Sequence, residues 1–149
     1  MRKIKTAVIG VGYLGKFHAD KYASLPNCEL IAVVDAHVDT AKAIAAKLNV
    51  QGLIDYKSLL GKVEAVSIAA PTTLHYQIAK DFLTHGSHVL IEKPITVTVE
   101  EADELIELAQ KHKRLIMFQL MMSVLTTMWL NVYTKKQKVL FILISISIN

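Results

Sequence analysis

The C-terminal end of this 149-residue sequence has no acidic residue, glycine or proline. The last acidic residue is Glu107, the last proline is Pro94 and the last glycine is Gly86. Residues 1–107 carry 11 basic and 13 acidic side chains, net −2, whereas residues 108–149 carry six basic side chains and no acidic ones, net +6. The basic residues do not cluster on one predicted face of the rest of the chain. The total charge of +4 therefore does not indicate a nucleic-acid partner.

Cysteine and long apolar runs are also scarce. Cys28 is alone, so it cannot form an internal disulfide, and this excludes a small secreted fold held together by disulfides. The charged start, residues 1–5, is not followed by an apolar run of signal-peptide length, so we expect a cytoplasmic protein. The apolar end, residues 139–148, is shorter than the roughly 18–20 residues that span a bilayer, so a membrane partner is not expected.

The six histidines do not predict a metal site. No pair of them falls at ligand spacing with a third aspartate, glutamate or cysteine. His18 is interpreted as a packing or capping residue, and the other histidines outside the motifs below are expected at solvent-side positions: His37, His85, His88 and His112.

Short apolar runs alternate with amphipathic segments. The runs are nearly continuous in valine, isoleucine, leucine and alanine, which is typical of parallel strands covered on both faces. They cover residues 6–9, 30–34, 65–70, 89–91 and 115–118, with a weaker strand at 53–54. Residues 39–48 and 98–112 have helical periodicity, Thr98 and Glu101 can form a capping box, and a short helix is expected at 56–60. This alternation predicts a doubly wound α/β sheet, a Rossmann fold, in a chain of single-domain length.

The strongest motif is the segment Gly10-Val11-Gly12-Tyr13-Leu14-Gly15, which has the G-x-G-x-x-G spacing. It follows a predicted strand and opens a predicted helix, which is the context that a dinucleotide-binding turn requires. Gly10 permits the tight turn, Gly12 leaves room for a pyrophosphate, and Gly15 allows the helix to pack closely. The helix start and its dipole supply the anion site.

Asp35 ends the second predicted strand, 20 residues after Gly15. Its carboxylate is expected to accept hydrogen bonds from the adenosine ribose and to repel a 2′-phosphate, which favours NAD over NADP. Ala36 and His37 follow where an NADP-binding protein more often places a hydroxyl and an arginine. The alternative is a glycine-rich turn followed by an ordinary strand-end carboxylate.

Three motifs in order resemble the N-terminal half of the glucose-fructose oxidoreductase, inositol dehydrogenase and rhizopine-catabolism (Gfo/Idh/MocA) family. They are residues 7–15 with His18-Ala19, then Ala70-Pro71-Thr72-Thr73-Leu74-His75, then Glu92-Lys93-Pro94. The resemblance extends to about Phe118. It implies the cofactor domain of a two-domain NAD(P)-dependent oxidoreductase that acts on sugars, sugar nucleotides or cyclitols.

The resemblance also implies roles for single residues. The loop Ala70-Pro71-Thr72 would lie along the dinucleotide, with His75 starting the next helix, and Glu92 and Lys93 would lie beside the nicotinamide. Both loops follow strands, so they are expected at the carboxyl edge where doubly wound sheets bind ligands.

Lys93 is the one candidate for chemistry. Hydride transfer from a secondary alcohol requires the hydroxyl proton to be held or removed, and a lysine amine can do this when it is neutral. A bound oxidised nicotinamide favours the neutral amine, whereas Glu92 favours the ammonium. The alternative is a solvated strand-end lysine before a turn-forming proline.

The segment 119–149 departs from the family pattern. The Arg-Phe-x-Pro segment and the downstream aspartate and histidine of family members are absent. We therefore expect a Rossmann domain at 1–118 and an atypical apolar and basic tail at 119–149. Three explanations are open: a change of reading frame near residue 118, a membrane-facing segment, or a dimerisation element through which the chain forms an oligomer.

The sequence therefore predicts the NAD-binding part of a sugar or sugar-nucleotide dehydrogenase. A sugar-like substrate is expected only if a second domain is supplied, so the isolated chain is expected to bind NAD(H) and to turn over poorly. The alternative is a non-catalytic dinucleotide-binding or partner-binding module.

Overall fold

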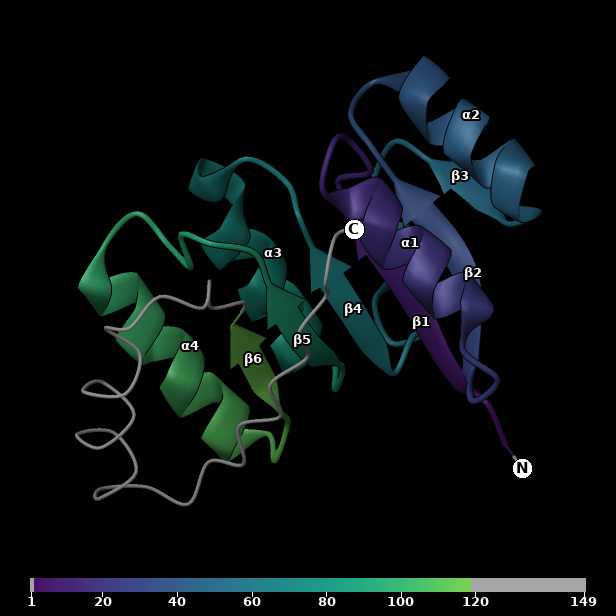
Figure 1. Ribbon diagram of the computed structural model, residues 1–149. Helices are drawn as coiled ribbons and strands as arrows, with labels where there is room; N and C mark the ends of the chain where they lie inside the picture. Colours follow the sequence, from purple (N-terminus) through teal and green to yellow (C-terminus); the bar gives the residue numbers. More distant parts are fainter. Residues whose placement is uncertain (1, 119–149) are drawn as a thin grey trace, which may run out of the picture.

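The computed structural model describes residues 2–118, which form one six-stranded parallel sheet with helices on both faces. The strands are β1 (Ile4–Ile9), β2 (Cys28–Val34), β3 (Gln51–Leu53), β4 (Ala65–Ile68), β5 (His88–Ile91) and β6 (Ile116–Phe118). Their order across the sheet is β3-β2-β1-β4-β5-β6, as Figure 1 shows. The chain thus winds outward from β1 in one direction and from β4 in the other. This confirms the predicted doubly wound fold.

Helices connect the strands. They are α1 (Gly15–Ser24), α2 (Val38–Leu48), α3 (Thr72–Thr84) and α4 (Val99–Lys111), with a short 3₁₀ helix, η1 (Lys57–Leu59), between β3 and β4. Helix α4 starts with the predicted capping box, because the Thr98 hydroxyl accepts the Glu101 amide at 3.3 Å while the Glu101 carboxylate accepts the Thr98 amide at 3.4 Å. No helix within residues 2–118 is long and apolar enough to cross a membrane.

The core has two layers because neighbouring residues on a strand point to opposite faces. Val8 of β1 packs with Ala19 of α1 and Ala45 of α2 on one face. Its neighbours on β1 pack on the other face with α3 and α4, in a larger cluster that includes Phe82 and Leu105. This double coverage explains the nearly continuous apolar strands.

Several predicted boundaries differ from the structure, and β1 and β2 each begin two residues earlier than expected, at Ile4 and Cys28. The run 65–70 was expected to be one strand, but β4 ends at Ile68, and Ala69 and Ala70 belong to the following loop. The weak strand lies at Gln51–Leu53 rather than at 53–54, and the helix at 56–60 is the shorter η1. Residues 119–149, for which a tail and an oligomer were expected, lie outside the described residues.

Candidate cofactor site

The three predicted motifs lie at the same edge of the sheet. The glycine-rich segment follows β1, residues 69–72 follow β4, and residues 92–95 follow β5. Strands β1 and β4 are neighbours, and the connections that leave them run in opposite directions. This is the point in the strand order at which doubly wound sheets generally bind ligands. The fold therefore brings together the residues that the sequence assigned to a dinucleotide.

The three glycines of the loop have different surroundings. Gly10 has a positive φ of +83°, and a Cβ there would lie 2.6 Å from the backbone nitrogen of Ala70. A Cβ on Gly15 would lie 1.7 Å from the Gly10 carbonyl oxygen, so α1 begins in direct contact with the turn. A Cβ on Gly12 would meet nothing within 4 Å. Gly10 and Gly15 are therefore required by the fold, whereas Gly12 faces open space in which a ligand can approach.

The start of α1 has no side-chain cap, and two of its first-turn amides, those of Lys16 and Phe17, donate to the carbonyl oxygens of Gly12 and Leu14 at 3.2 and 3.0 Å. The N-cap residue is Leu14, and the first turn of the helix has no acidic residue. Tyr13 is 76% exposed and meets Phe17 edge to face, with ring centroids 5.9 Å apart. The Lys16 amine lies 5.2 Å from each of these two ring centroids. An anion at this helix end would meet the positive end of the dipole and a nearby cation.

Asp35 fixes the end of β2 to the glycine-rich loop. One carboxylate oxygen accepts the Val11 amide at 3.0 Å, and the other accepts the His37 amide at 2.9 Å. A carboxylate has about four lone-pair sites, so each oxygen retains one for a further donor. Because the side chain is half-buried, its remaining acceptor positions are partly open to solvent. Ala36 and His37 are exposed, and for His37 this was expected from the sequence.

The loop after β4 is tied to the loop after β5 by His75. Pro71 is the N-cap residue of α3 and Thr72 is its first residue, so His75 lies in the first turn, three residues after the start of the helix. Its ring is only 1% exposed. Nε2 lies 2.7 Å from the Ala70 carbonyl oxygen, whereas Nδ1 lies 3.0 Å from that of Pro94 and 3.2 Å from that of Ile95.

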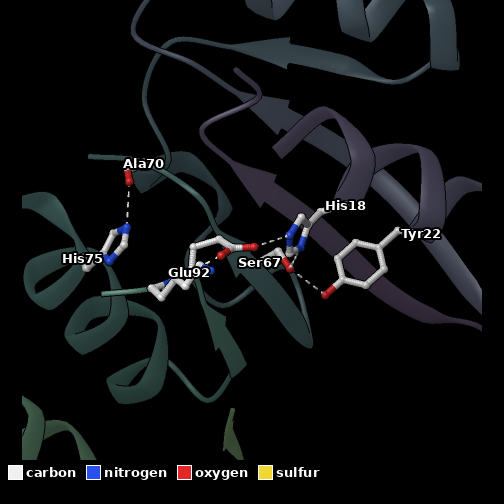
Figure 2. Close-up of polar contacts among 7 residues, drawn as sticks. His18, Tyr22, Ser67, Ala70, His75 and Glu92 are labelled. Atoms are coloured by element: carbon white, nitrogen blue, oxygen red, sulfur yellow. Dashed lines mark hydrogen bonds and ion pairs between the residues drawn. The ribbon is translucent and has the colours of Figure 1, made fainter. Parts of the chain in front are cut away.

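Glu92 and Lys93 follow β5 but face in different directions. Glu92 is 4% exposed, and one oxygen of its carboxylate lies 2.8 Å from Nε2 of His18, which is equally buried. The other oxygen accepts the Lys93 amide at 3.3 Å. Lys93 itself is exposed. The Glu92 carboxylate is therefore directed into the protein, as Figure 2 shows, while Lys93 remains available at the sheet edge.

The buried group extends beyond Glu92 to residues that the sequence did not single out. Nδ1 of His18 lies 3.0 Å from the hydroxyl oxygen of Ser67, which is 3.0 Å from the Tyr22 hydroxyl (Figure 2). Burial raises the pKa of Tyr22, so the phenol keeps its proton. Ser67 is the one polar residue in the apolar run 65–70, and this position is the signal by which the sequence could have indicated a buried polar contact. His18 was interpreted as a packing or capping residue, and the structure shows that it joins α1 to the loop after β5.

The remaining histidines differ in part from expectation. His37 and His85 are exposed as predicted, whereas His88 and His112 are half-buried. His88 accepts the Leu115 amide on Nδ1 at 2.9 Å. Burial, followed by the nearby charge of Arg114, lowers its pKa. Within residues 2–118 no group of three or more histidine, cysteine, aspartate or glutamate side chains could hold a metal ion.

Comparison with known proteins places residues 4–120 in a defined family. A family model described as "Oxidoreductase family, NAD-binding Rossmann fold" matches residues 4–120. UDP-N-acetylglucosamine 3-dehydrogenase from Acidithiobacillus ferrooxidans is 44% identical over 111 residues, covering 74% of this chain and 35% of that protein. Its structure matches with a TM-score of 0.74 at 42% identity, covering 79% of this chain and 38% of that one.

Two further structures match a similar share of the chain. Scyllo-inositol dehydrogenase from Lactobacillus casei, with bound NAD(H) and scyllo-inositol, has a TM-score of 0.73 at 25% identity and covers 78% of this chain and 36% of that one. A 3-ketoreductase from Actinomadura kijaniata, in complex with TDP-benzene and NADP, has a TM-score of 0.71 at 27% identity, and the match covers 78% of this chain and 37% of that one. The chain therefore spans about a third of the length of the curated relatives it matches.

Proposed function

Because the chain belongs to the Gfo/Idh/MocA family of oxidoreductases, whose NAD-binding Rossmann domain it contains, we propose that residues 2–118 present a nicotinamide for hydride exchange with a sugar or sugar-nucleotide hydroxyl. The observation that carries the proposal is the glycine-rich loop. It has an open position at Gly12, an uncapped helix start behind it and the Asp35 carboxylate fixed beside it. Recognition of the sugar would need groups beyond this cofactor domain.

The pyrophosphate is assigned to the loop 10–15. Gly12 would allow the diphosphate to approach the backbone, and the positive end of the α1 dipole would face it, while the Lys16 and Phe17 amides keep their bonds within the turn. The aromatic pair Tyr13 and Phe17 and the exposed Leu14 would border the same site. Ala70, Pro71 and Thr72 would lie along the remainder of the dinucleotide, because their loop follows the neighbouring strand β4.

Asp35 supports NAD rather than NADP as the cofactor of this chain. Two backbone amides hold its carboxylate in place, so its charge would stay at the position where the adenosine ribose hydroxyls are expected. A 2′-phosphate would be repelled there, and the exposed Ala36 and His37 supply no arginine to offset the repulsion. The two structures described above contain NAD(H) in one case and NADP in the other, so this chain's own residues carry the argument.

Lys93 is proposed as the catalytic residue. When bound, NAD would supply the hydride acceptor for a carbinol C–H. Lys93, exposed at the end of β5, would hold or accept the hydroxyl proton that leaves as the carbonyl forms. The Glu92 carboxylate is engaged by His18 and by the Lys93 backbone amide, so its effect on the amine would be indirect. The rival proposal is a non-catalytic module that binds a dinucleotide or a partner protein.

A titration of the chain with NAD⁺ and NADH tests the pyrophosphate assignment. The variant Gly12→Val should weaken binding at least about tenfold, or about 1.4 kcal/mol, because the side chain occupies the position of the diphosphate. Ala23→Val is the matched control, since it adds a side chain of the same kind at an exposed position near the other end of α1. Unchanged affinity in Gly12→Val would remove the assignment. A measurable sugar dehydrogenase rate from the chain would favour the enzyme over the non-catalytic module and would contradict the expected poor turnover.

The preference for NAD is tested by the ratio of two dissociation constants, for NADP⁺ and for NAD⁺. In the wild type the ratio should exceed about ten, and Asp35→Asn should reduce it at least about fivefold because the repelling charge is lost. The ratio is the appropriate measure, since any loosening of the loop weakens both ligands. Asp39→Asn is the control, because it removes an exposed carboxylate from the start of α2. Equal ratios in wild type and Asp35→Asn would refute the role of Asp35.

A further inference from the structure

We propose that the two buried histidines, His18 and His75, are positioning residues for Lys93, and that they act by holding the residues on either side of it. The inference rests on the proposed function, because it concerns how Lys93 is presented to a bound cofactor. It assigns a role to two side chains that do not themselves face the open edge of the sheet: His18 is 4% exposed and His75 is 1% exposed.

On the N-terminal side of Lys93, the anchor is the contact between His18 and Glu92. The Nε2–Oε1 distance is 2.8 Å and both side chains are almost fully buried. A buried carboxylate without a partner would be costly, so Glu92 is strongly held at this place. Its second oxygen accepts the amide of Lys93 at 3.3 Å. The position of the Lys93 backbone is therefore linked through Glu92 to α1.

On the C-terminal side, the anchor is the contact of His75 with the carbonyl oxygens of Pro94 and Ile95. Carbonyl oxygens only accept hydrogen bonds, so a ring nitrogen of His75 bonds to them only when it carries a proton. A neutral imidazole carries one N–H and donates on one side only, whereas an imidazolium donates from both nitrogens, to these two carbonyls and to that of Ala70 at 2.7 Å. His75 therefore links the segment that follows Lys93 to the loop after β4, which is the loop assigned to the dinucleotide.

The two anchors leave Lys93 as an exposed residue between held neighbours. A lysine side chain has a flexible four-carbon stem, and fixing its backbone limits the region that its amine can reach. An amine presented within reach of the nicotinamide saves part of the entropy cost of the reaction. If the histidines only filled space in the core, the direction of their hydrogen bonds would have no effect on Lys93.

Substituting each histidine by asparagine or by glutamine tests its two ring nitrogens one at a time, because each amide can replace the hydrogen bond of only one nitrogen. An asparagine amide nitrogen lies near the place of Nδ1, and that of glutamine lies near the place of Nε2. At position 18, His18→Gln would keep the contact with Glu92, whereas His18→Asn would keep only the contact with Ser67. At position 75 the order is reversed, because His75→Asn would keep the contacts with Pro94 and Ile95, whereas His75→Gln would keep only the one with Ala70. If only the volume of the side chain mattered, glutamine would not be the better replacement at position 18 and asparagine the better one at position 75.

The experiment measures how fast trace acetic anhydride labels the Lys93 amine in the 149-residue chain, with and without NAD⁺, by mass spectrometry. Exposed Lys113 serves as the internal reference. With NAD⁺ at ten times its dissociation constant, about a tenth of the protein is free, so labelling of a covered Lys93 should fall about tenfold. His18→Gln and His75→Asn should retain most of this protection. His18→Asn and His75→Gln should reduce it to less than about twofold, each compared at ten times its own dissociation constant.

The possible outcomes are distinct. Absence of NAD⁺ binding in the wild type overturns the proposed function, and binding without protection of Lys93 overturns the role of this lysine. Binding with equal protection in the asparagine and glutamine variants overturns the positioning inference alone. If these variants do not fold, nitrogen-15 NMR of the wild type decides between the alternatives. Slowly exchanging protons on Nε2 of His18 and Nδ1 of His75 support the inference, and their absence overturns it.

Discussion

The two halves of the sheet contribute different kinds of groups to the candidate site. In the half formed by β1, β2 and β3, the site consists of a glycine-rich turn, a helix start and one carboxylate that two backbone amides hold. In the half formed by β4, β5 and β6, it consists of exposed Lys93 above a buried set of polar side chains that includes Ser67, His75 and Glu92. The first half offers backbone groups and one fixed carboxylate, and the second half presents a lysine side chain.

This difference explains where each half tolerates change. A backbone site depends on small residues at fixed positions, so a single Cβ decides whether the turn can form. A buried polar set depends on every member having a partner, so removing one group leaves another unsatisfied. Among residues 2–118 no buried side-chain nitrogen or oxygen lacks a hydrogen-bond partner, which is the condition that such a set requires.

The largest expected effect lies in the half formed by β1, β2 and β3, which contains the glycine-rich turn and is called the glycine half. Gly15→Ala should lower the free energy of unfolding by at least about 3 kcal/mol, because the new Cβ would overlap the backbone carbonyl of Gly10 and α1 would have to move. Urea denaturation measures this loss. Gly12→Ala is the matched control and should leave stability nearly unchanged, since nothing lies within 4 Å of its added carbon. Equal stability of the two variants would show that the contact between α1 and the turn is not tight.

A smaller effect is expected in the half formed by β4, β5 and β6, which contains the buried polar side chains and is called the polar half. Ser67→Ala removes the hydroxyl that contacts both His18 and Tyr22, and it should cost about 1–3 kcal/mol of unfolding free energy. Tyr22→Phe removes only the outer contact and should cost less, about 0.5–1.5 kcal/mol. Both are measured by urea denaturation at the same pH. If Ser67→Ala is as stable as the wild type, the buried polar set does not stabilise this half, and the contrast between the halves disappears.

The smallest effect concerns the outer part of the polar half, where burial lowers the pKa of His88. The unfolded chain then binds a proton at a higher pH than the folded protein does. The contribution of His88 to the unfolding free energy is therefore fully present above the ordinary histidine pKa of about 6.5. This contribution is lost as the pH falls below that value. Unfolding free energies at several pH values between 7.5 and 5 measure the slope. His88→Asn, which can still accept the Leu115 amide, should flatten it, whereas His37→Asn should not, because His37 is exposed.

Much of the fold was readable from local patterns. Five apolar runs predicted the main strands, and Thr98 with Glu101 predicted the start of α4, because each of these signals lies within a few consecutive residues. The end of β4 was placed two residues too late, because Ala69 and Ala70 continue the apolar run after the strand pairing has ended. Composition alone does not indicate where a strand loses its partner.

The sequence by itself determined the glycine-rich turn and Asp35 at the end of β2, because the conformational needs of such a turn are met within one short segment. Only the tertiary structure decided the partners of Glu92. His18 lies 74 residues before it, and their contact depends on how α1 packs against β1 and β4. The contacts of His75 with Ala70 and Pro94 likewise form only when two separate strands end side by side. A contact between distant residues depends on packing geometry, which no local pattern encodes.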